Sequence, residues 1–518
     1  MKRMNVLVAG LISFALLRFT IDMKEINRYL LMLLIPASLF LSGCQKEISP
    51  DNDQPVPAEI SRFIWDGLNE VYLWNKDVDK LSTSYFPTTN DYYAYLNSYN
   101  TDYEGLFYSL LYDLDLQRRW SWIVDDYVAL EQSFAGISKS MGYDWRLVNF
   151  AGTDNYFGFV RYVVPGSPAD IAGIKRGDYF LYVDGQQITG SNYYNLLIES
   201  ESYTLSMATI SGTTVSTNGI TRALAAVVLQ EDPVHYHSVM DIGGVKTAYL
   251  VYNSFNSEFD TDLNDVFGTF VSEGVQRLIL DLRYNGGGSI LSAVYLASMI
   301  YTTNTDIVFS KREYNDLLQT YFLSEYGAAF FNYYFADEID TITVNHPTPP
   351  ALPAINNLGI TDLYVITSSG TASASELVIN GLEPYINVTL IGEDTYGKNV
   401  GSITLKDYYT RNGVLNPDHK WAMQPIVLKI ANSLNFGDYI NGLPPDVSVD
   451  EGFLDLLPFG DANEILLKTA TDYILGLKSV RAQPLYVRGV DWFVIADSRD
   501  FVPFSRDMYD NRRLILNK

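Results

Sequence analysis

The sequence contains one cysteine, Cys44, and only four histidines among 518 residues. A single cysteine forms no disulfide within the chain and supplies no cysteine-based metal site. Basic residues are also few, 36 against 61 acidic residues, and the formal net charge is −25. Because this charge repels phosphate groups, we do not expect nucleic acid as a partner.

Apolar residues, by contrast, are plentiful. They make up 47% of the chain, and charged residues make up 19%, which is the composition of a folded globular protein rather than a disordered one. The chain is too long for one ordinary hydrophobic core, so we expect roughly two to four domains.

The segment before Cys44 predicts an exported protein with a lipid anchor. Lys24 and Arg28 precede an uncharged run from Tyr29 to Leu41, which is short for a membrane span and has the shape of a secretory signal. The sequence Leu-Ser-Gly-Cys, which ends at Cys44, resembles the lipoprotein box of bacteria. The resemblance implies cleavage before Cys44, acylation of this residue, and attachment to the outer membrane of the cell envelope. A buried cysteine in a short helix is the alternative.

The stretch VVPGSPADIAGIKRGDYFLYVDGQQI, residues 163–188, predicts a turn, a short helix and a strand between tight turns. Gly173 can end the short helix as a C-cap, and Gly177 with Asp178 turns the chain into the strand. This order resembles the PDZ domain, with a general β domain as the alternative. The resemblance implies a peptide-binding edge, where backbone amides take a C-terminal carboxylate and a peptide adds as a strand, at Met141, Gly142 and Tyr143.

The stretch SSGTASASEL, residues 368–377, joins a hydrophobic strand, LYVITS, to a predicted helix, ASELVINGL. Small residues permit a sharp turn that projects a hydroxyl group, and the start of the helix supplies amides for an anion. The pattern is not Gly-x-Ser-x-Gly, so it does not indicate an α/β-hydrolase. A serine nucleophile also needs a base, and a helix N-cap without catalytic role is the other interpretation of a serine at this place.

Lysine is the candidate base, because no histidine lies in the setting of a catalytic triad. His235 and His237 are two positions apart on one face of a predicted strand and suit a metal ion, but no third ligand is evident. Lys398, in GEDTYGKNVGS, follows a predicted strand and turn. A lysine acts as a base when burial lowers its pKa from about 10.4 in water towards neutrality.

The motifs GTASASEL, TYGK and DLRYNGGG together resemble the C-terminal processing (tail-specific) proteases. These are serine peptidases with a Ser–Lys dyad on a crotonase-like core, preceded by a PDZ domain. In that family the nucleophile lies 25 positions before the lysine, which selects Ser373 for Lys398. The resemblance implies that Ser373 attacks the scissile carbonyl and that Lys398 takes its proton. It also implies an oxyanion hole built from the backbone amides of Gly287, Gly288 and Ala374.

One position departs from the family. The usual third catalytic residue is a glutamine four positions after the lysine, and this chain has Ser402 there. Ser402 is therefore a candidate to orient Lys398. NGLPPDVSVD, residues 441–450, resembles the closing strand of the family.

The predicted fold is multi-domain, with a helical N-terminal domain, a PDZ-like β domain and a crotonase-like α/β protease core. The expected segments are a leader (1–44), a polar tether (45–60), the helical domain (61–130), the PDZ-like domain (131–230), the protease core (231–476) and a C-terminal tail of unknown role (477–518).

These features predict an envelope lipoprotein endopeptidase that cleaves peptide bonds in proteins with exposed C-terminal tails. It would need no cofactor or metal, and would contact the membrane through the lipid on Cys44. A non-catalytic peptide-binding lipoprotein on the same fold is the main alternative, which Ser402 supports. A crotonase-fold enzyme acting on an acyl thioester is a remote third, since the export signal and the PDZ-like stretch argue against it.

Overall fold

The computed structural model describes residues 54–113, 120–150, 152–340, 352–408, 413–477, 492–502 and 505–510. The expected leader, Cys44 and most of the tether lie outside these residues. Contacts divide the chain into one unit of Met1–Val56 with Pro87–Ala94, and a second unit that holds the rest. The elements discussed below belong to the second unit, except for one helix that crosses the division. No helix in the described parts of the chain has the length and apolar character needed to cross a membrane.

The N-terminal region is helical, as the sequence predicts. Its α-helices are α2 (Glu59–Val71), α3 (Thr89–Asn97, which crosses the division between the units) and α4 (Tyr103–Ser109). Helix α2 buries Phe63, Ile64, Leu68 and Val71 at helical spacing, which explains why this stretch folds as a helix. Two short 3₁₀ turns follow α2, at Asn75–Asp77 and Asp79–Leu81.

A small antiparallel sheet ties this region to the protease core. Strand β1 (Trp122–Val124) pairs with β20 (Ala422–Gln424), which in turn pairs with β19 (Leu405–Lys406). Helix α6 (Tyr127–Phe134) follows β1. A two-stranded sheet of β2 (Ile137–Ser140) and β9 (Val227–Gln230) then flanks the next domain.

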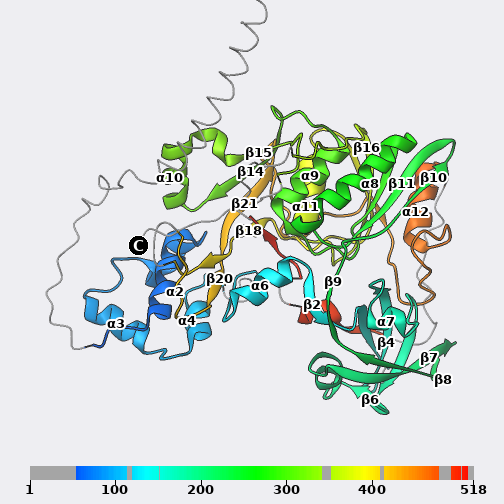
Figure 1. Ribbon diagram of the computed structural model, residues 1–518, viewed down its shortest axis with the longest axis horizontal. Helices are drawn as coiled ribbons and strands as arrows, with labels where there is room; N and C mark the ends of the chain where they lie inside the picture. The colour runs from blue at the N-terminus through cyan, green and yellow to red at the C-terminus, as the bar shows by residue number, and fades with distance from the viewer. Residues whose placement is uncertain are drawn as a thin grey trace, which may run out of the picture. The chain divides into compact units, whose positions relative to one another are not determined.

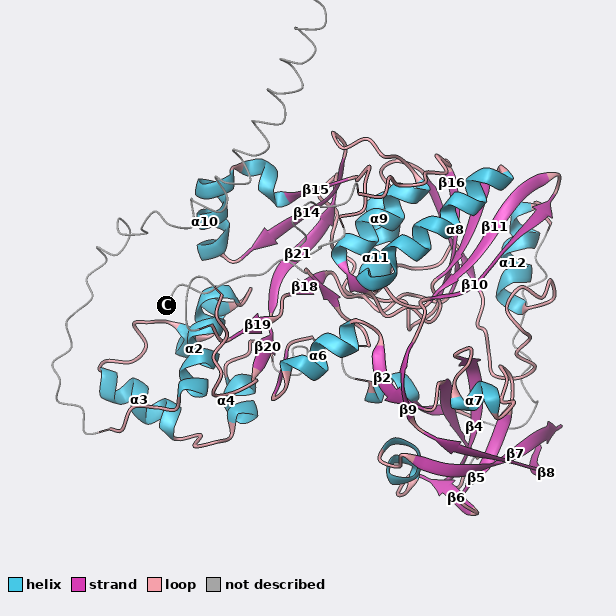
Figure 2. Cartoon of the chain, in the orientation of Figure 1, coloured by secondary structure: helices cyan, strands magenta, loops and turns pink. Residues whose placement is uncertain are grey.

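The PDZ-like domain is a seven-stranded sheet in the order β23-β3-β4-β6-β5-β7-β8, of which Figure 2 labels β4 to β8. The strands are β3 (Tyr143–Asn149), β4 (Asn155–Val163), β5 (Tyr179–Val183), β6 (Gln186–Thr189), β7 (Ser202–Ser211), β8 (Thr214–Ala225) and β23 (Val494–Asp497). The predicted short helix is α7 (Pro168–Ile171), and Gly173 follows it at a φ of +78°. A π-helical turn, η4 (Tyr194–Ile198), packs against the same core.

The protease core is built on a six-stranded sheet in the order β10-β11-β12-β16-β17-β22. Its strands are β10 (Val234–Ile242), β11 (Val245–Tyr252), β12 (Arg277–Asp281), β16 (Asp362–Thr367), β17 (Asn387–Gly392) and β22 (Val447–Ser448). The neighbouring strands β11, β12, β16, β17 and β22 of this sheet pair in parallel, and β10 is antiparallel to β11. Parallel pairing agrees with the predicted alternation of strands and helices.

Helices cover this sheet. Helix α12 (Ile465–Ile474) packs on one face through Leu466, Leu467 and Ala470. Helices α8 (Asp260–Glu273), α9 (Ile290–Ile300) and α11 (Ala374–Leu382) lie beside one another in Figure 1. The ring of His237, on β10, contacts that of Phe270, on α8.

A second six-stranded sheet has the order β13-β24-β18-β21-β14-β15. Its strands are β13 (Gly288–Ser289), β24 (Met508–Tyr509), β18 (Val400–Ser402), β21 (Ile426–Asn432), β14 (Val308–Tyr314) and β15 (Asn332–Tyr334). Helix α10 (Asp316–Tyr326) and the 3₁₀ turn Ala328–Phe331 lie between β14 and β15 in the chain. Another 3₁₀ turn, Ser257–Phe259, precedes α8. The tail, which the sequence left unassigned, thus supplies β23 to the PDZ-like sheet and β24 to this one.

Candidate active site

Two neighbouring parallel strands carry the loops that bear the predicted site. Strand β12 ends at Asp281 and leads into the glycine loop, while β16 ends at Thr367 and leads to Ser373. Asp281 is paired with Ile366, so the two loops leave the same edge of the sheet. Carboxyl ends of parallel strands are where α/β proteins place their sites.

Ser373 differs from the other serines of its stretch. Its backbone has a φ of +65°, in the left-handed region that non-glycine residues rarely adopt, which is typical of a strained nucleophile turn. Its hydroxyl is buried and has no hydrogen-bond partner among the residues that the structure describes. Ser368 donates to the carbonyl of Arg283, Ser375 donates to that of Asn285, and Ser369 is exposed. Of these four serines, Ser373 is therefore the one whose hydroxyl is buried and makes no hydrogen bond to the described residues.

Glu376 connects the predicted nucleophile and base. One oxygen of its buried carboxylate accepts hydrogen bonds from the backbone amides of Ser373 at 2.7 Å and Lys398 at 2.9 Å. The other oxygen accepts from the amide of Gly397 and the hydroxyl of Thr395. Burial raises the pKa of Glu376, and these hydrogen bonds oppose that rise. No role of Glu376 was predicted from the sequence, although a glutamate three positions after a serine at a helix start has the spacing of a capping box.

Lys398 is buried, and its ammonium group is held by the C-terminal tail. It donates to the backbone carbonyl of Arg506 at 3.1 Å and forms an ion pair with Asp507. Asp507 also accepts a 2.9 Å hydrogen bond from the indole of Trp122. Burial raises the pKa of Asp507, and the charge of Lys398 opposes that rise. The contacts of the Lys398 ammonium in this state lie in the tail rather than on Ser373.

The glycine loop lies against Ser373. A Cβ atom added to Gly287 would stand 2.8 Å from the Cβ of Ser373 and 3.0 Å from the backbone nitrogen of Ala374. The loop therefore approaches Ser373 closely only because it has no side chain there. The amide of Gly287, however, donates to the side chain of Asn285 at 2.9 Å, so the expectation that it serves the oxyanion hole is not met in this state. The amides of Gly288 and Ala374 stay as predicted donors.

Ser402 does not contact the lysine as expected. Its hydroxyl lies 3.2 Å from the carbonyl oxygen of Met508, to which it donates, and it accepts a 3.0 Å hydrogen bond from the side-chain amide of Gln424. Ser402 belongs to β18, which pairs with the tail strand β24, and this register aims its side chain at the tail. Ser402 therefore contacts the C-terminal tail.

The predicted peptide edge of the PDZ-like domain opens on a cavity of about 420 Å³. Met141, Gly142 and Tyr143 line this cavity together with the glycine loop of the core, Gly286 to Gly288. The amide of Gly142 donates to Ser140, so it is engaged within the loop. The cavity connects the predicted peptide edge with the predicted active site.

The two histidines do not share a site. A register shift between Val234 and Tyr236 disturbs the strand where the sequence predicted one common face. The ring of His235 contacts Tyr162 and Phe459, whereas that of His237 contacts Phe270. Burial lowers the pKa of His235 to about 4. Within the described ranges, no group of three or more His, Cys, Asp or Glu residues is placed to hold a metal ion.

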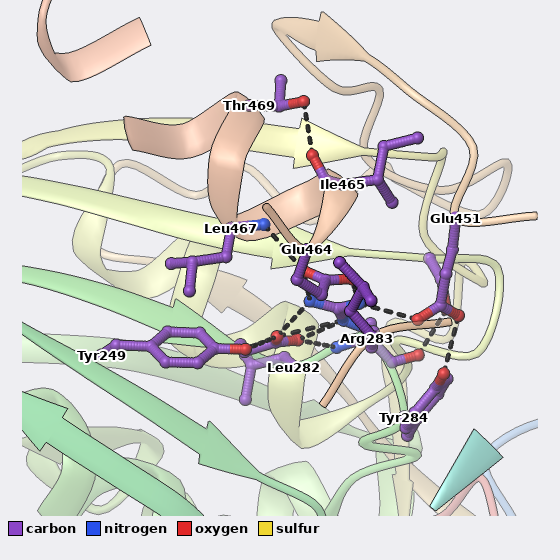
Figure 3. A network of polar contacts seen from close by, with 12 residues as sticks. Tyr249, Leu282, Arg283, Tyr284, Glu451, Glu464, Ile465, Leu467 and Thr469 are labelled. Carbon is purple, nitrogen blue, oxygen red and sulfur yellow. Dashed lines mark hydrogen bonds and ion pairs between the residues drawn. The ribbon is translucent and has the colours of Figure 1, made fainter. Parts of the chain in front are cut away.

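Arg283, which precedes the glycine loop in the chain, lies in a buried ion network (Figure 3). Arg283 contacts Asp281 and donates at 2.7 Å to both Glu451 and Glu464. Arg176, from the PDZ-like domain, donates to Glu451 at 2.6 Å. Burial alone would raise the pKa of Glu451, but the two guanidinium groups hold it well below its usual range. The network joins the PDZ-like domain to the strand end that carries the loop.

Comparison with known proteins identifies the family. The model of peptidase family S41 matches residues 246–429, that of the peptidase S41 N-terminal domain matches 59–122, and that of the PDZ domain matches 159–205. The chain thus carries a segment of peptidase family S41, an S41 N-terminal domain and a PDZ domain, as the sequence motifs predicted.

Named relatives are distant. The carboxyl-terminal-processing peptidase 1 of Arabidopsis thaliana chloroplasts is 26% identical over 244 residues, which cover 46% of this chain and 42% of the relative. The carboxyl-terminal-processing protease of Picosynechococcus is 25% identical over 240 residues, 45% of this chain and 49% of the relative. The chain thus spans about half the length of the curated relatives it matches. A crystal structure of a Bacteroides fragilis protein assigned to the S41 proteases shares the fold, with a TM-score of 0.60 and 26% identity over 80% of this chain and 97% of that one.

Proposed function

We propose that this chain is an envelope-anchored serine endopeptidase that cleaves proteins with exposed C-terminal tails, with Ser373 as nucleophile and Lys398 as general base. The observation that carries the proposal is the carboxylate of Glu376, which binds the backbone amides of both residues. One rigid group therefore fixes the nucleophile relative to the base. The unpartnered hydroxyl of Ser373, on a strained turn at a helix start, supports the same assignment.

The chemistry follows from this arrangement. The neutral amine of Lys398 accepts the proton as the Ser373 oxygen attacks the scissile carbonyl, and returns it to the leaving amine. A water molecule then releases the acyl group from Ser373. The amides of Gly288 and Ala374 are the proposed donors to the oxyanion, and one such donor is typically worth about 3 kcal/mol to the transition state.

The substrate and location rest on other features. The PDZ-like edge at Met141 to Tyr143 shares its cavity with the glycine loop, which suits capture of a peptide next to the active site. The names of the relatives, which refer to carboxyl-terminal processing, support a preference for C-terminal tails. The signal-like segment and the Leu-Ser-Gly-Cys sequence at Cys44 support a lipid anchor in the outer membrane.

A non-catalytic peptide-binding protein is the second candidate. The ammonium of Lys398 pairs with Asp507 and not with Ser373, and a scaffold would show the same contacts. Its prediction is binding of tailed peptides without cleavage.

Cleavage of unfolded casein separates the two candidates. The full-length protein, Ser373→Ala and Lys398→Ala are incubated with casein, and the products are read by mass spectrometry. We expect cleavage by the wild type and a loss of about a hundredfold or more in each variant, because nucleophile and base act as one unit. Ser369→Ala is the matched control, since this serine of the same stretch is exposed. Undiminished cleavage by Ser373→Ala would contradict the proposal.

A further inference from the structure

The C-terminal segment, here residues 492–502 and 505–510, lies along both predicted peptide sites. Its first strand, β23, is the outer strand of the PDZ-like sheet and pairs with β3. Its second strand, β24, lies between β13 and β18 of the core, and is the red strand beside β18 in Figure 1. The segment therefore runs from the PDZ-like edge to the space between β13 and β18, which is called the cleft below.

At the PDZ-like edge the segment binds as an added antiparallel strand. Val494 pairs with Val148 and Asp497 with Arg146, and the hydroxyl of Ser498 accepts from the amide of Trp145. Tyr143, the last residue of the predicted peptide edge, is the first residue of strand β3. Strand addition to an exposed edge is how PDZ domains take peptides.

Charge and apolar contacts hold this part in place. The carboxylate of Asp497 contacts the guanidinium groups of Arg146 and Arg161, and these hold its pKa well below the usual range although burial alone would raise it. Phe501 packs against the PDZ core, with its ring 5.7 Å from that of Tyr194 and 6.1 Å from that of Tyr193. Side chains of the segment thus replace those of a bound peptide.

In the cleft the segment adds as a parallel strand. Met508 pairs with Gly288, and Tyr509 pairs with both Ser289 and Ser402. The hydroxyl of Ser402 donates to the carbonyl of Met508. The ring of Tyr509 stacks on Phe134 of α6 at 4.2 Å. Main-chain pairing on both sides is the way an extended substrate is held, and it does not depend on the sequence of the peptide.

The segment also reaches the catalytic groups. The carbonyl oxygen of Asp507 lies 2.6 Å from the place of a Cβ on Gly287, next to Ser373 and the amide of Ala374. Its side chain forms the buried ion pair with Lys398. The segment therefore engages the side-chain nitrogen of Lys398, the group that the proposed mechanism needs as its base.

The last described residue anchors the segment beyond the active site. Asp510 accepts a 2.7 Å hydrogen bond from the hydroxyl of Tyr333 and lies 3.4 Å from the guanidinium of Arg312. Its amide donates to the carbonyl of Ser402 at 3.0 Å. The segment is therefore held on both sides of Asp507.

We propose that the C-terminal segment is an intramolecular pseudosubstrate that occupies the PDZ-like edge and the cleft together, so that the wild type cleaves slowly, through the fraction of molecules from which this segment is displaced. The proposal rests on the proposed peptidase function. A ligand in the same chain acts at an effective concentration of the order of millimolar, so a free substrate competes poorly. The ion pair between Lys398 and Asp507 makes the occupied state inactive as well as blocked.

Asp507→Asn in the full-length protein tests the proposal. The substitution keeps the shape of the side chain and removes the charge that pairs with Lys398. We expect casein cleavage at least tenfold faster than in the wild type. Asp316→Asn is the matched control, since it breaks a Lys–Asp pair at the surface, with Lys76, and we expect the wild-type rate. A rate for Asp507→Asn equal to or below the wild-type rate would overturn the proposal. Tyr509→Ala, which removes the stack on Phe134, repeats the test if Asp507→Asn does not fold.

A double variant separates this proposal from the proposed function. If Asp507→Asn with Ser373→Ala cleaves as fast as Asp507→Asn alone, the nucleophile assignment is wrong. If cleavage depends on Ser373 but Asp507→Asn gives no gain, only the pseudosubstrate is wrong.

Two further readouts do not depend on casein. Hydrogen exchange followed by mass spectrometry measures the amides of Met508 and Tyr509, which we expect to be protected in the wild type and exposed in Asp507→Asn. Rapid exchange in the wild type would overturn the proposal. A Ser373-dependent loss of the residues after Asp507, seen in the intact mass of the wild type, would also contradict it, because the segment would then be a substrate.

Discussion

The backbone amide of Lys398 donates a 2.9 Å hydrogen bond to the carboxylate of Glu376, although 22 positions separate the two residues. The same carboxylate oxygen accepts the amide of Ser373. The backbones of the proposed nucleophile and the proposed base are thus held together by a carboxylate that has no proposed part in bond breaking.

Glu376→Ala is predicted to lower both stability and activity. The change leaves the amides of Ser373, Gly397 and Lys398 and the hydroxyl of Thr395 without their acceptor in a buried place. We expect the free energy of unfolding to fall by about 3 kcal/mol, and casein cleavage to fall at least tenfold even where the protein is fully folded. Urea unfolding and the casein assay measure these effects.

Glu383→Ala is the control for this variant, because Glu383 caps the other end of α11 and has an exposed side chain. It should change stability by less than about 0.5 kcal/mol. Equal effects of the two substitutions would contradict the role of Glu376.

Ser402→Ala is predicted to weaken substrate binding rather than the chemical step. Its hydroxyl contacts a backbone carbonyl in the cleft, and Gln424 would lose its acceptor. For a peptide substrate of the Asp507→Asn variant we expect KM to rise about fivefold, which corresponds to the net value of one hydrogen bond of about 1 kcal/mol, with kcat changed by less than twofold. Ser310→Ala, at a buried serine whose hydroxyl has no partner, should leave KM unchanged. A large loss in kcat with unchanged KM would instead support the original expectation that Ser402 orients the lysine.

Docking of the C-terminal segment is predicted to weaken as the pH rises. Burial raises the pKa of Asp510 to about 6, and Arg312 and Tyr333, which face it, oppose this rise. The docked carboxyl therefore binds its proton more tightly than the free one. The contribution of Asp510 to the free energy of docking is complete below about pH 4 and is lost as the pH rises through about 6. For a pKa difference of two units between the docked and the free carboxyl, this loss amounts to about 3 kcal/mol.

The difference between the wild type and Asp510→Asn isolates this group, since burial raises the pKa of Asp507 as well and acts in the same direction. Hydrogen exchange of Met508 and Tyr509, corrected for the intrinsic rates, should show a steeper loss of protection with pH in the wild type than in Asp510→Asn. Parallel pH profiles for the two proteins would refute the assignment.

Arg283→Met is predicted to destabilise the core strongly. Arg283 neutralises Asp281, Glu451 and Glu464, all of them buried or nearly so. Removing one partner of a buried ion pair costs about 3–5 kcal/mol, because charges stay behind without compensation. Thermal and urea unfolding measure this cost. Lys468→Met, which breaks a surface pair with Asp472, should cost less than about 1 kcal/mol.

Local patterns in the sequence predicted much of the fold. The helical spacing of Phe63, Ile64 and Leu68 predicted α2, and the turn glycines around residues 163–188 predicted the PDZ-like domain. The hydrophobic runs before Arg283 and Ser368 predicted β12 and β16. Each of these signals arises from residues that are near one another in the chain.

Contacts between distant segments escaped prediction. Asp507 lies 109 positions from its partner Lys398, and Trp122 lies 385 positions from Asp507. Nothing in the local pattern of residues 505–510 marks them as a strand, because two strands far away in sequence supply the pairing partners. The contacts of Ser402 were not predicted for the same reason, since the position of the tail decides what its hydroxyl contacts.

Trapping of the acyl-enzyme tests the central claim most directly. The wild type, Asp507→Asn and Asp507→Asn with Ser373→Ala are mixed with p-nitrophenyl acetate and quenched, and the acetylated peptides are identified by mass spectrometry. The account predicts a rapid, stoichiometric acetylation of Ser373 in Asp507→Asn, a slower one in the wild type, and none at this position in the double variant. A stoichiometric acetyl group on another residue, with Ser373 unmodified in Asp507→Asn, would contradict it.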